Sequence, residues 1–307
     1  MIADAAETSI TDQILLPVFS PELEQKIFET TAFLHPFTIL KLLLVARRVH
    51  FWIEPMLYNT VQIAAKSGSG AAVLRAIHTK PAGFFHKAVR NLFLFPIHWI
   101  FSGPRSKDPW SDEELAGVLR ACSGVVNLLL FCVKFSSPVT LPMLAPAEMR
   151  PQRITVIADS DTTLDLTRPV FTNVRRLDLL AVRPENDSIF ENAQHLRNLT
   201  RLSSLTHIAF ESRVAPKILN TILSGCLNLQ MVLLLGEGFA REAAELHDQR
   251  LVVHENFFRE GGEHENHQDF FEGGKDIWAG VDEFMARKQR GEIPGIRLFF
   301  EGDDSEL

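Results

Sequence analysis

The sequence predicts an α/β (α+β) fold in which an N-terminal three-helix unit precedes an irregular solenoid of strand–helix repeats with a C-terminal capping helix. Three observations predict this fold. Apolar residues recur at helical spacing near the N-terminus, short apolar strands built on one template recur along the middle of the chain, and a helical stripe returns near the C-terminus. The expected parts are a flexible tail at 1–14, the helical unit at 15–65, the repeats at 71–255, a polar loop at 256–274, and the capping helix with an acidic tail at 275–307.

Composition places the chain among globular proteins and disfavours two classes of partner. With 307 residues and 46% hydrophobic content, the chain is long enough to bury a substantial core. A formal net charge of −7 argues against nucleic-acid binding, which depends on Lys and Arg side chains that neutralise phosphates. The longest apolar runs, at 38–46 and 125–133, are far shorter than the ~20 residues that span a bilayer. We therefore expect no nucleic-acid partner and no membrane partner.

The cysteines and the first residues indicate a reducing compartment. Cys122, Cys132 and Cys226 form neither a disulfide framework nor a zinc-ligand set at a usual spacing. The N-terminal residues lack the positive charge and the apolar core of a secretory signal. We expect a cytoplasmic or nuclear protein.

The N-terminal unit carries signals for three short helices. Ser20 is a favoured N-cap and Pro21 suits the first helical turn. His35-Pro36 ends this helix, because the residue before a proline is pushed out of the α region. A second helix is expected from Ile39 to about Val49, and a third short segment from Phe51 to Leu57. Three small helices have too little interior for the apolar side chains that they carry, so we expect surplus apolar surface that docks on a partner.

An ordered series of short motifs runs through this unit. In chain order the motifs are Leu16-Pro17, Glu22-Leu23, Ile27-Phe28, Leu42-Leu43-Leu44-Val45 before Arg47-Arg48, Trp52, Pro55 and Leu57-Tyr58. The series resembles the F-box, and it looks closest to the divergent F-box-like proteins of fungi. The resemblance implies a unit that binds the Skp-type adaptor of a cullin-based, SCF-type ubiquitin ligase. Carried over by position, the implied adaptor-binding residues are Leu16, Pro17, Leu23, Ile27, Phe28, Leu44, Val45 and Trp52.

A strand template recurs after the helical unit. Its clearest copies are Cys122-x-x-Val125-x-x-Leu128-x-Leu130 and Cys226-x-x-Leu229-x-x-Val232-x-Leu234, each after an amphipathic helix. Equivalent apolar positions are Leu92, Leu128, Ile154, Leu177, Ile208, Val232 and Leu251. Most of the steps between them fall in or near the ~20–29 residues of a leucine-rich repeat. The pattern resembles the degenerate leucine-rich repeats that often follow an F-box, although the Asn or Cys expected after each strand is missing. A doubly wound α/β domain is the competing architecture.

The residues between these inward-facing positions point to the opposite face of the predicted sheet. Many of them are apolar, whereas a solvated sheet face should alternate with polar residues. Either another segment covers this face, such as the helix that contains Trp278, or the face is an apolar surface for a protein ligand. For the second case the candidate target-binding residues are Phe93, Phe131, Asp178, Glu211 and Leu235.

No residue pattern makes a convincing catalytic or metal site. The closest candidate is the cluster of three histidines and three glutamates at His254, Glu255, Glu263, His264, Glu265 and His267. It is not the HExxH of a zinc helix, and it lies in a glycine-rich segment instead of on a rigid element. We therefore expect no catalytic residue, no metal ligand and no cofactor; an α/β enzyme that uses this loop is the alternative.

Together these features predict a non-catalytic protein. The resemblance implies a substrate-recognition subunit of an SCF ubiquitin ligase, which binds a Skp-type adaptor and, through it, a cullin. The repeats would bind a protein substrate that the sequence does not identify. The alternative is a leucine-rich-repeat interaction scaffold outside any ligase, whose helical unit only caps the solenoid.

Overall fold

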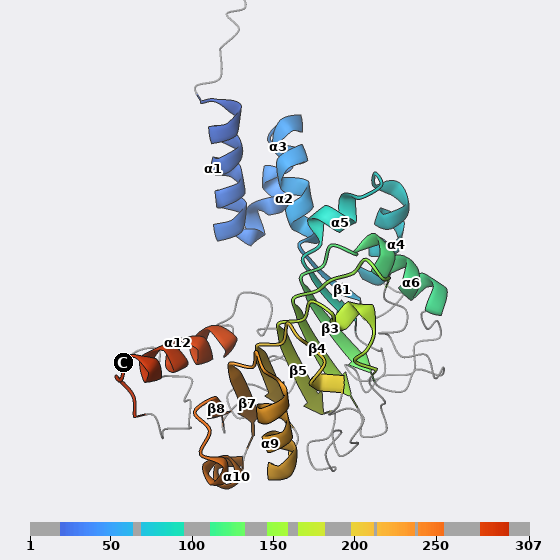
Figure 1. Cartoon of the computed structure of the whole chain (residues 1–307). Coiled ribbons are helices and arrows are strands. Elements are labelled where there is room, and N and C mark those ends of the chain that lie inside the picture. The colour runs from blue at the N-terminus through green and yellow to red at the C-terminus, as the bar shows by residue number, and fades with distance from the viewer. Residues whose placement is uncertain are drawn as a thin grey trace, which may run out of the picture. The chain divides into compact units, whose positions relative to one another are not determined.

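A computed structural model describes residues 19–63, 69–94, 111–132, 146–158, 165–181, 198–211, 214–236, 239–254 and 277–294. The chain divides into two compact units, residues 1–57 and 58–307 (Figure 1). The first unit is helical. The second contains a parallel β-sheet with helices, so the predicted mixed α/β class is confirmed.

The helices of the first unit begin largely where the sequence predicts. Helix α1 spans Pro21–Leu34, and the Ser20 hydroxyl accepts a hydrogen bond from the Leu23 amide. The break at His35-Pro36 is also confirmed. The elements that follow are η1 (Pro36–Thr38), α2 (Ile39–Leu42), α3 (Arg47–Ile53) and η2 (Glu54–Tyr58).

The predicted helix from Ile39 to Val49 is instead two helices with a turn between them. Helix α2 stops at Leu42, and Ala46 adopts an extended conformation (φ −161°, ψ 156°) before α3 begins. The apolar run 42–45 did not reveal this turn, because every residue in it tolerates a helix. The turn places Leu44 and Val45 outside the regular helical faces, where their side chains are exposed.

The first unit has a small core of its own. Four fully buried residues form it, and six partly buried ones, including Phe28 and Trp52, pack against them; the four are Ala32, Ile39, Val49 and Ile53. An ion pair between Arg48 and Glu24, at 2.8 Å, joins the start of α3 to the first turn of α1. Two residues assigned to this unit's motif series, Leu16 and Pro17, lie outside the described residues.

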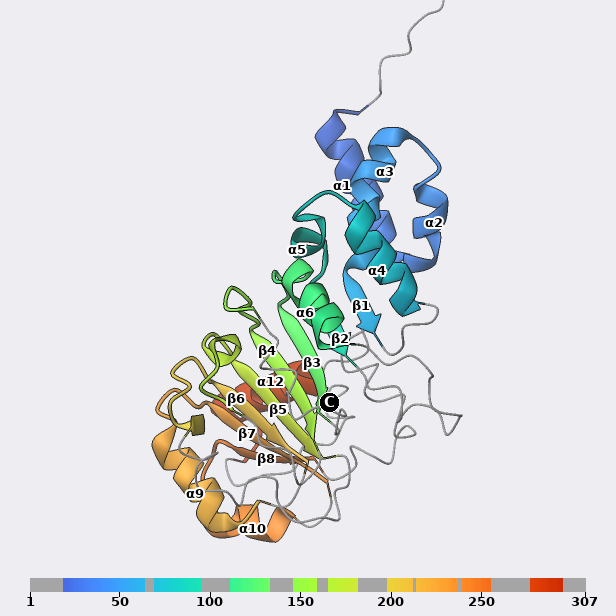
Figure 2. The same ribbon diagram turned by 90° about the vertical axis from the view of Figure 1, so that its right-hand side faces the viewer.

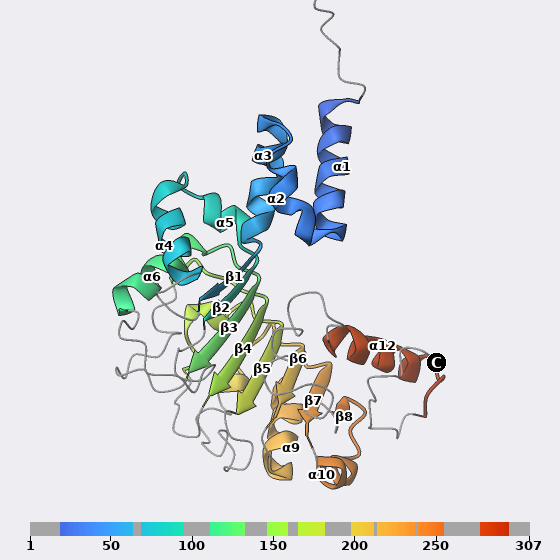
Figure 3. The same ribbon diagram turned by 180° about the vertical axis from the view of Figure 1, so that it is seen from behind.

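The second unit contains an eight-stranded sheet in which every neighbouring pair is parallel and strand order follows chain order (Figure 3). Its strands are β1 (Thr60–Ile63), β2 (Asn91–Leu94), β3 (Asn127–Cys132), β4 (Arg153–Ala158), β5 (Arg176–Ala181), β6 (His207–Phe210), β7 (Met231–Leu235) and β8 (Leu251–His254). A doubly wound sheet reverses its strand order at a switch point, and this sheet does not. The template positions pair in register, as in Leu128↔Ile154 and Ile154↔Leu177.

Strand β1 was not predicted. The sequence boundary at residue 65 assigned it to the helical unit, but β1 pairs with β2 and belongs to the second unit. Tyr58, which the motif series also assigned to the helical unit, packs its ring edge-on against Phe84 and Phe85 at 5.4 and 5.1 Å. The first unit therefore ends earlier, at Leu57.

Helices cover one face of the sheet. The described ones are α4 (Ser69–Thr79), α5 (Phe84–Ala88), α6 (Asp112–Ala121), the short η3 (Pro169–Phe171), α9 (Pro216–Gly225) and α10 (Phe239–Leu246). The Ser-x-x-Glu sequence of Ser111 and Glu114 forms a capping box at the start of α6. The template residues Leu128, Ile154 and Leu177 are buried with this helical layer in the larger core.

A single described helix, α12 (Ile277–Gln289), covers the opposite face of the sheet, and Figure 2 shows it behind the strands. Its residues Trp278, Val281 and Phe284 are buried against residues of β2 to β8 in a second core. A helix here was predicted, and it covers this face across many strands instead of capping only the last one. All-parallel sheets are buried on both faces in this way.

We expect Trp278→Ala to lower the free energy of unfolding of the second unit by about 3–5 kcal/mol, because the indole is fully buried between α12 and the sheet. Urea denaturation followed by circular dichroism measures this change. The control Gln289→Ala, at the exposed end of α12, should lie within about 0.5 kcal/mol of wild type. A loss below about 1 kcal/mol for Trp278→Ala would contradict the packing of α12 on the sheet.

Candidate functional site

The first unit displays large apolar side chains that its own core does not bury. Of the predicted adaptor-binding residues, four are exposed: Leu23 by 50%, Ile27 by 43%, Leu44 by 86% and Val45 by 58%. Leu23 and Ile27 are four residues apart and share one face of α1. Burying each such side chain in an interface is worth roughly 1.5–3 kcal/mol.

The Glu24–Arg48 ion pair brings these residues together. It fixes the start of α3 beside the first turn of α1, which carries Leu23. The turn with Leu44 and Val45 directly precedes α3, so it lies near the same end of α1. The exposed residues of α1 and of the turn therefore lie towards the same end of the unit, and we call these four residues together the α1–turn surface (Leu23, Ile27, Leu44, Val45).

Two predicted adaptor-binding residues have another role. Phe28 and Trp52 are partly buried against the unit's small core, so packing inside the unit accounts for most of their surface. The sequence did not single out several exposed aromatic and aliphatic residues as binding candidates, of which Phe37 is the most extreme at 97% exposure. The others are Phe19, Phe33, Leu34, Leu40, Phe51 and Leu57. The sequence does show that the unit has more apolar side chains than so small a core is able to bury. It does not show which of these side chains are exposed.

The predicted target-binding residues do not form an exposed surface. Phe93, Asp178, Glu211 and Leu235 are all buried, and the Phe131 side chain lies outside the described residues. Phe93 and Leu235 belong to the core beneath α12. This corrects the interpretation of the second sheet face as a ligand surface: of the two explanations, cover by the helix that contains Trp278 is the one that the structure supports.

A polar network lies within this covered face. The buried Asp178 carboxylate accepts hydrogen bonds from Arg153 Nε (3.0 Å), Thr155 Oγ1 (2.6 Å) and Trp278 Nε1 (2.9 Å). Asp282 lies on α12 together with Trp278. Its carboxylate accepts a hydrogen bond from Arg176 Nη2 at 2.5 Å and lies 3.1 Å from His207 Nε2. Asp178 and Arg176 of β5 and His207 of β6 thus make polar contacts to α12. Arg153 and Thr155 of β4 hold the Asp178 carboxylate in place.

The pKa of Asp282 is shifted by its contacts with Arg176 and His207 of the sheet. Burial would raise the pKa of this carboxyl, but the hydrogen bond with His207 and the positive charge of Arg176 outweigh burial and lower the pKa below its ordinary value. The ionised form is therefore favoured in the folded protein.

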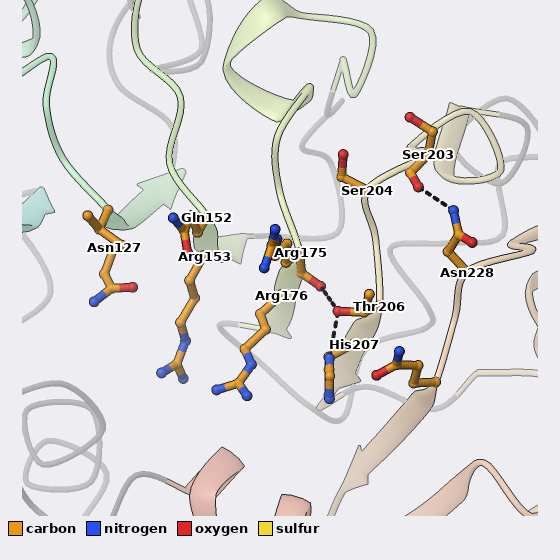
Figure 4. A pocket seen from close by; sticks show the side chains of 12 residues that line it. Asn127, Gln152, Arg153, Arg175, Arg176, Ser203, Ser204, Thr206, His207 and Asn228 are labelled. Carbon is orange, nitrogen blue, oxygen red and sulfur yellow. Dashed lines mark hydrogen bonds between the residues drawn. The ribbon is translucent and has the colours of Figure 1, made fainter.

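A pocket of about 680 Å³ opens where strands β3 to β7 begin. Asn127, Arg153, Arg176 and His207 are the first residues of four successive strands, and they pair in register across the sheet. Figure 4 shows Arg153, Arg176 and His207 pointing the same way from neighbouring strands. None of the residues that line the pocket is acidic. The sequence analysis missed this site, because the arginines come from segments far apart in the chain.

The described residues offer little for catalysis or metal binding. Burial raises the pKa of the Cys122 thiol to about 12 and of the Cys226 thiol to about 11, so both are unreactive near neutral pH. Among the described residues, no three His, Cys, Asp or Glu side chains come together as a metal site would require. His254 is buried on β8, and the other residues of the predicted loop cluster lie outside the described part of the chain.

Comparisons with known proteins found no match to this chain among family models, curated proteins or solved structures. Within the part of the chain that the structure describes, no helix combines the length and the apolar character needed to cross a membrane.

We expect the stability difference between wild type and Asp282→Asn to depend on pH. Because the pKa of Asp282 is lowered on folding, ionisation stabilises the folded protein above the unfolded-state pKa of about 3.9. Wild type should therefore be more stable at pH 7, by about 1 kcal/mol or less for a partly exposed pair, and the difference should shrink as the pH falls below about 4.

Urea denaturation at pH 7, 5 and 3 measures this dependence. The control Glu283→Gln changes a carboxylate on the exposed side of α12, and it should not show a comparable loss of stability at pH 7. An advantage of wild type over Asp282→Asn that is equally large at pH 3 and pH 7 would contradict the role of the ionised carboxylate.

Proposed function

We propose that this protein is the substrate-recognition subunit of an SCF-type ubiquitin ligase. In this proposal the first unit is an F-box-like domain that binds a Skp-type adaptor and, through it, a cullin. The second unit is an irregular leucine-rich-repeat domain that binds a protein substrate. The observation that carries the proposal is the exposed α1–turn surface on a unit with its own small core.

Energetics support a partner for this surface. The four side chains of the α1–turn surface would together contribute several kcal/mol if a partner buried them, at roughly 1.5–3 kcal/mol each. Association itself costs an estimated 4–15 kcal/mol, so further contacts are needed. Leu40, exposed on α2 before the turn, is available to extend the contact. Exposed apolar surface on this scale marks an interaction site more often than a feature of a free surface.

The sheet architecture supports the repeat assignment. Parallel strands in chain order, most of which carry the same apolar template, are what stacked strand–helix repeats produce. The described residues contain no arrangement that favours an enzyme over a receptor. A receptor of this kind does no bond chemistry; it raises the effective concentration of a substrate near the ubiquitin-transfer machinery.

The double variant Ile27→Asp/Val45→Asp tests the proposal. Both side chains are exposed on the α1–turn surface of the free protein, so the variant should fold. In the complex the adaptor would bury the two new carboxylates, and we expect this to weaken adaptor binding by at least about 100-fold. Calorimetric titration with a purified Skp-type adaptor measures the affinity, and circular dichroism checks the fold.

A matched control makes the same change of −2 in net charge at polar exposed positions of the same unit, as Thr30→Asp/Lys41→Gln, and should retain binding within a few fold. If wild type shows no adaptor binding, the ligase assignment fails and the scaffold alternative is favoured. If both double variants bind as wild type does, the adaptor does not use the α1–turn surface, and the proposal fails in its present form.

A further inference from the structure

We propose that the pocket at the start of strands β3 to β7 binds an extended peptide segment that carries oxyanion groups, either carboxylates or phosphates. The inference deepens the proposed function by naming a class of target, and its biological role rests on that function. The binding itself does not require the adaptor. α12 covers the second sheet face, whereas this pocket is a concave polar site on the described part of the sheet.

The arginines of the pocket differ in how their charge is balanced. Arg153, Arg175 and Arg176 line the pocket, in a chain with a formal net charge of −7, and no acidic residue lines it. From outside the lining, Asp178 pairs with Arg153 and Asp282 pairs with Arg176. The planar guanidinium group presents a fork of N–H donors that matches a carboxylate or a phosphate. No acidic side chain of the described residues pairs with the exposed Arg175. An acidic ligand would therefore be attracted to this edge of an otherwise acidic protein.

The backbone holds this edge in a repeated geometry. The amides of Arg175 and Arg176 both donate to the carbonyl oxygen of Gln152, at 2.8 and 3.1 Å. In the next strand, the amides of Thr206 and His207 both donate to the carbonyl oxygen of Arg175, at 2.9 Å each. The strands thus begin in register, which places Arg153, Arg176 and His207 side by side on neighbouring strands, and the rigid backbone lowers the entropic cost of binding.

Two of the arginines are also held in place by their side chains. Arg153 donates to the buried Asp178, and Arg176 donates to Asp282 while its guanidinium lies 5.7 Å from the ring centre of Trp278. The attachment of α12 therefore orients the cationic side of the pocket before any ligand arrives. Charged groups that are already positioned lose less side-chain entropy when they bind.

The shape of the array favours an extended peptide over a compact molecule. Neighbouring strands lie about 4.8 Å apart, so the five strands β3 to β7 span about 19 Å. A peptide in an extended conformation covers that distance with about six residues. The amide and hydroxyl side chains in the row, among them Asn127, Gln152, Ser204 and Gln230, are suited to hydrogen bonds with a peptide backbone.

A nucleic acid offers the same oxyanions but fits the pocket less well. Single strands bind by stacking their bases on aromatic side chains as well as by charge. The lining residues include no Phe, Tyr or Trp. Together with the acidic net charge, this favours a peptide.

Fluorescence polarisation with labelled six-residue peptides tests the inference on the full-length chain without adaptor. The probes are a peptide that alternates Glu with Ser, the same peptide with Gln for Glu, and the Gln peptide with phosphoserine for Ser. We expect the Glu peptide, the phosphoserine peptide or both to bind at least 10-fold more tightly than the uncharged peptide, and more weakly as salt is added. Which charged peptide binds more tightly identifies the source of the oxyanion.

Arg175→Gln is the decisive variant, because this side chain is exposed and its loss should not disturb the fold. We expect it to weaken the charged peptides about 10-fold, whereas Lys217→Gln, on the exposed start of α9, should leave their affinity unchanged. Equal affinity for all three peptides would overturn the inference. So would a single-stranded oligonucleotide that binds more tightly than any peptide and is lost with Arg175→Gln.

These outcomes are separable from those of the adaptor experiment. Ile27→Asp/Val45→Asp alters only the first unit, so it should bind the charged peptides as wild type does. Loss of adaptor binding with retained peptide binding supports both assignments. Absence of peptide binding in a protein that binds adaptor overturns only the peptide site.

Discussion

The carboxylate of Asp178 is buried beneath α12, and it accepts hydrogen bonds from two neighbouring residues of β4 and from the indole of Trp278. A charged or polar group is tolerated in such a place only when its hydrogen bonds are satisfied. The network therefore requires α12 in this position, since removal of the indole would leave the carboxylate short of a donor. The apolar residues of α12 are buried against the sheet, and the hydrogen bond between Asp178 and Trp278 sets where the helix lies on it.

This constraint belongs to a sheet that is covered on both faces. Strands that are apolar on both faces need cover on both faces, and here the helical layer covers one and α12 the other. A polar pocket opens where strands β3 to β7 begin. The arginines there are oriented by the same acidic residues that attach α12, so the packing of this helix and the character of the pocket are linked.

The first unit illustrates the opposite situation. Its core consists of four fully buried residues, and a unit of this size buries a smaller fraction of its surface than the sheet unit does. The ion pair between Arg48 and Glu24 adds little by itself, since surface pairs are worth about 0–1 kcal/mol, but it sets which apolar residues lie together. The result is a stable framework for a surface that is suited to a partner.

Local patterns in the sequence determined much of the fold. The Ser20 cap, the break at Pro36, the capping box at Ser111 and the strand template all act between residues close in the chain, so the order of the amino acids alone predicts them. Only the tertiary structure decided that α12 covers the second sheet face, that Leu44 and Val45 lie in a turn, and that arginines of β4 and β5 share a pocket. Those features depend on contacts between residues far apart in sequence, such as Asp178 with Trp278, and on competition among apolar side chains for a limited core. The spacing of apolar residues along the chain does not show which of them the core will bury.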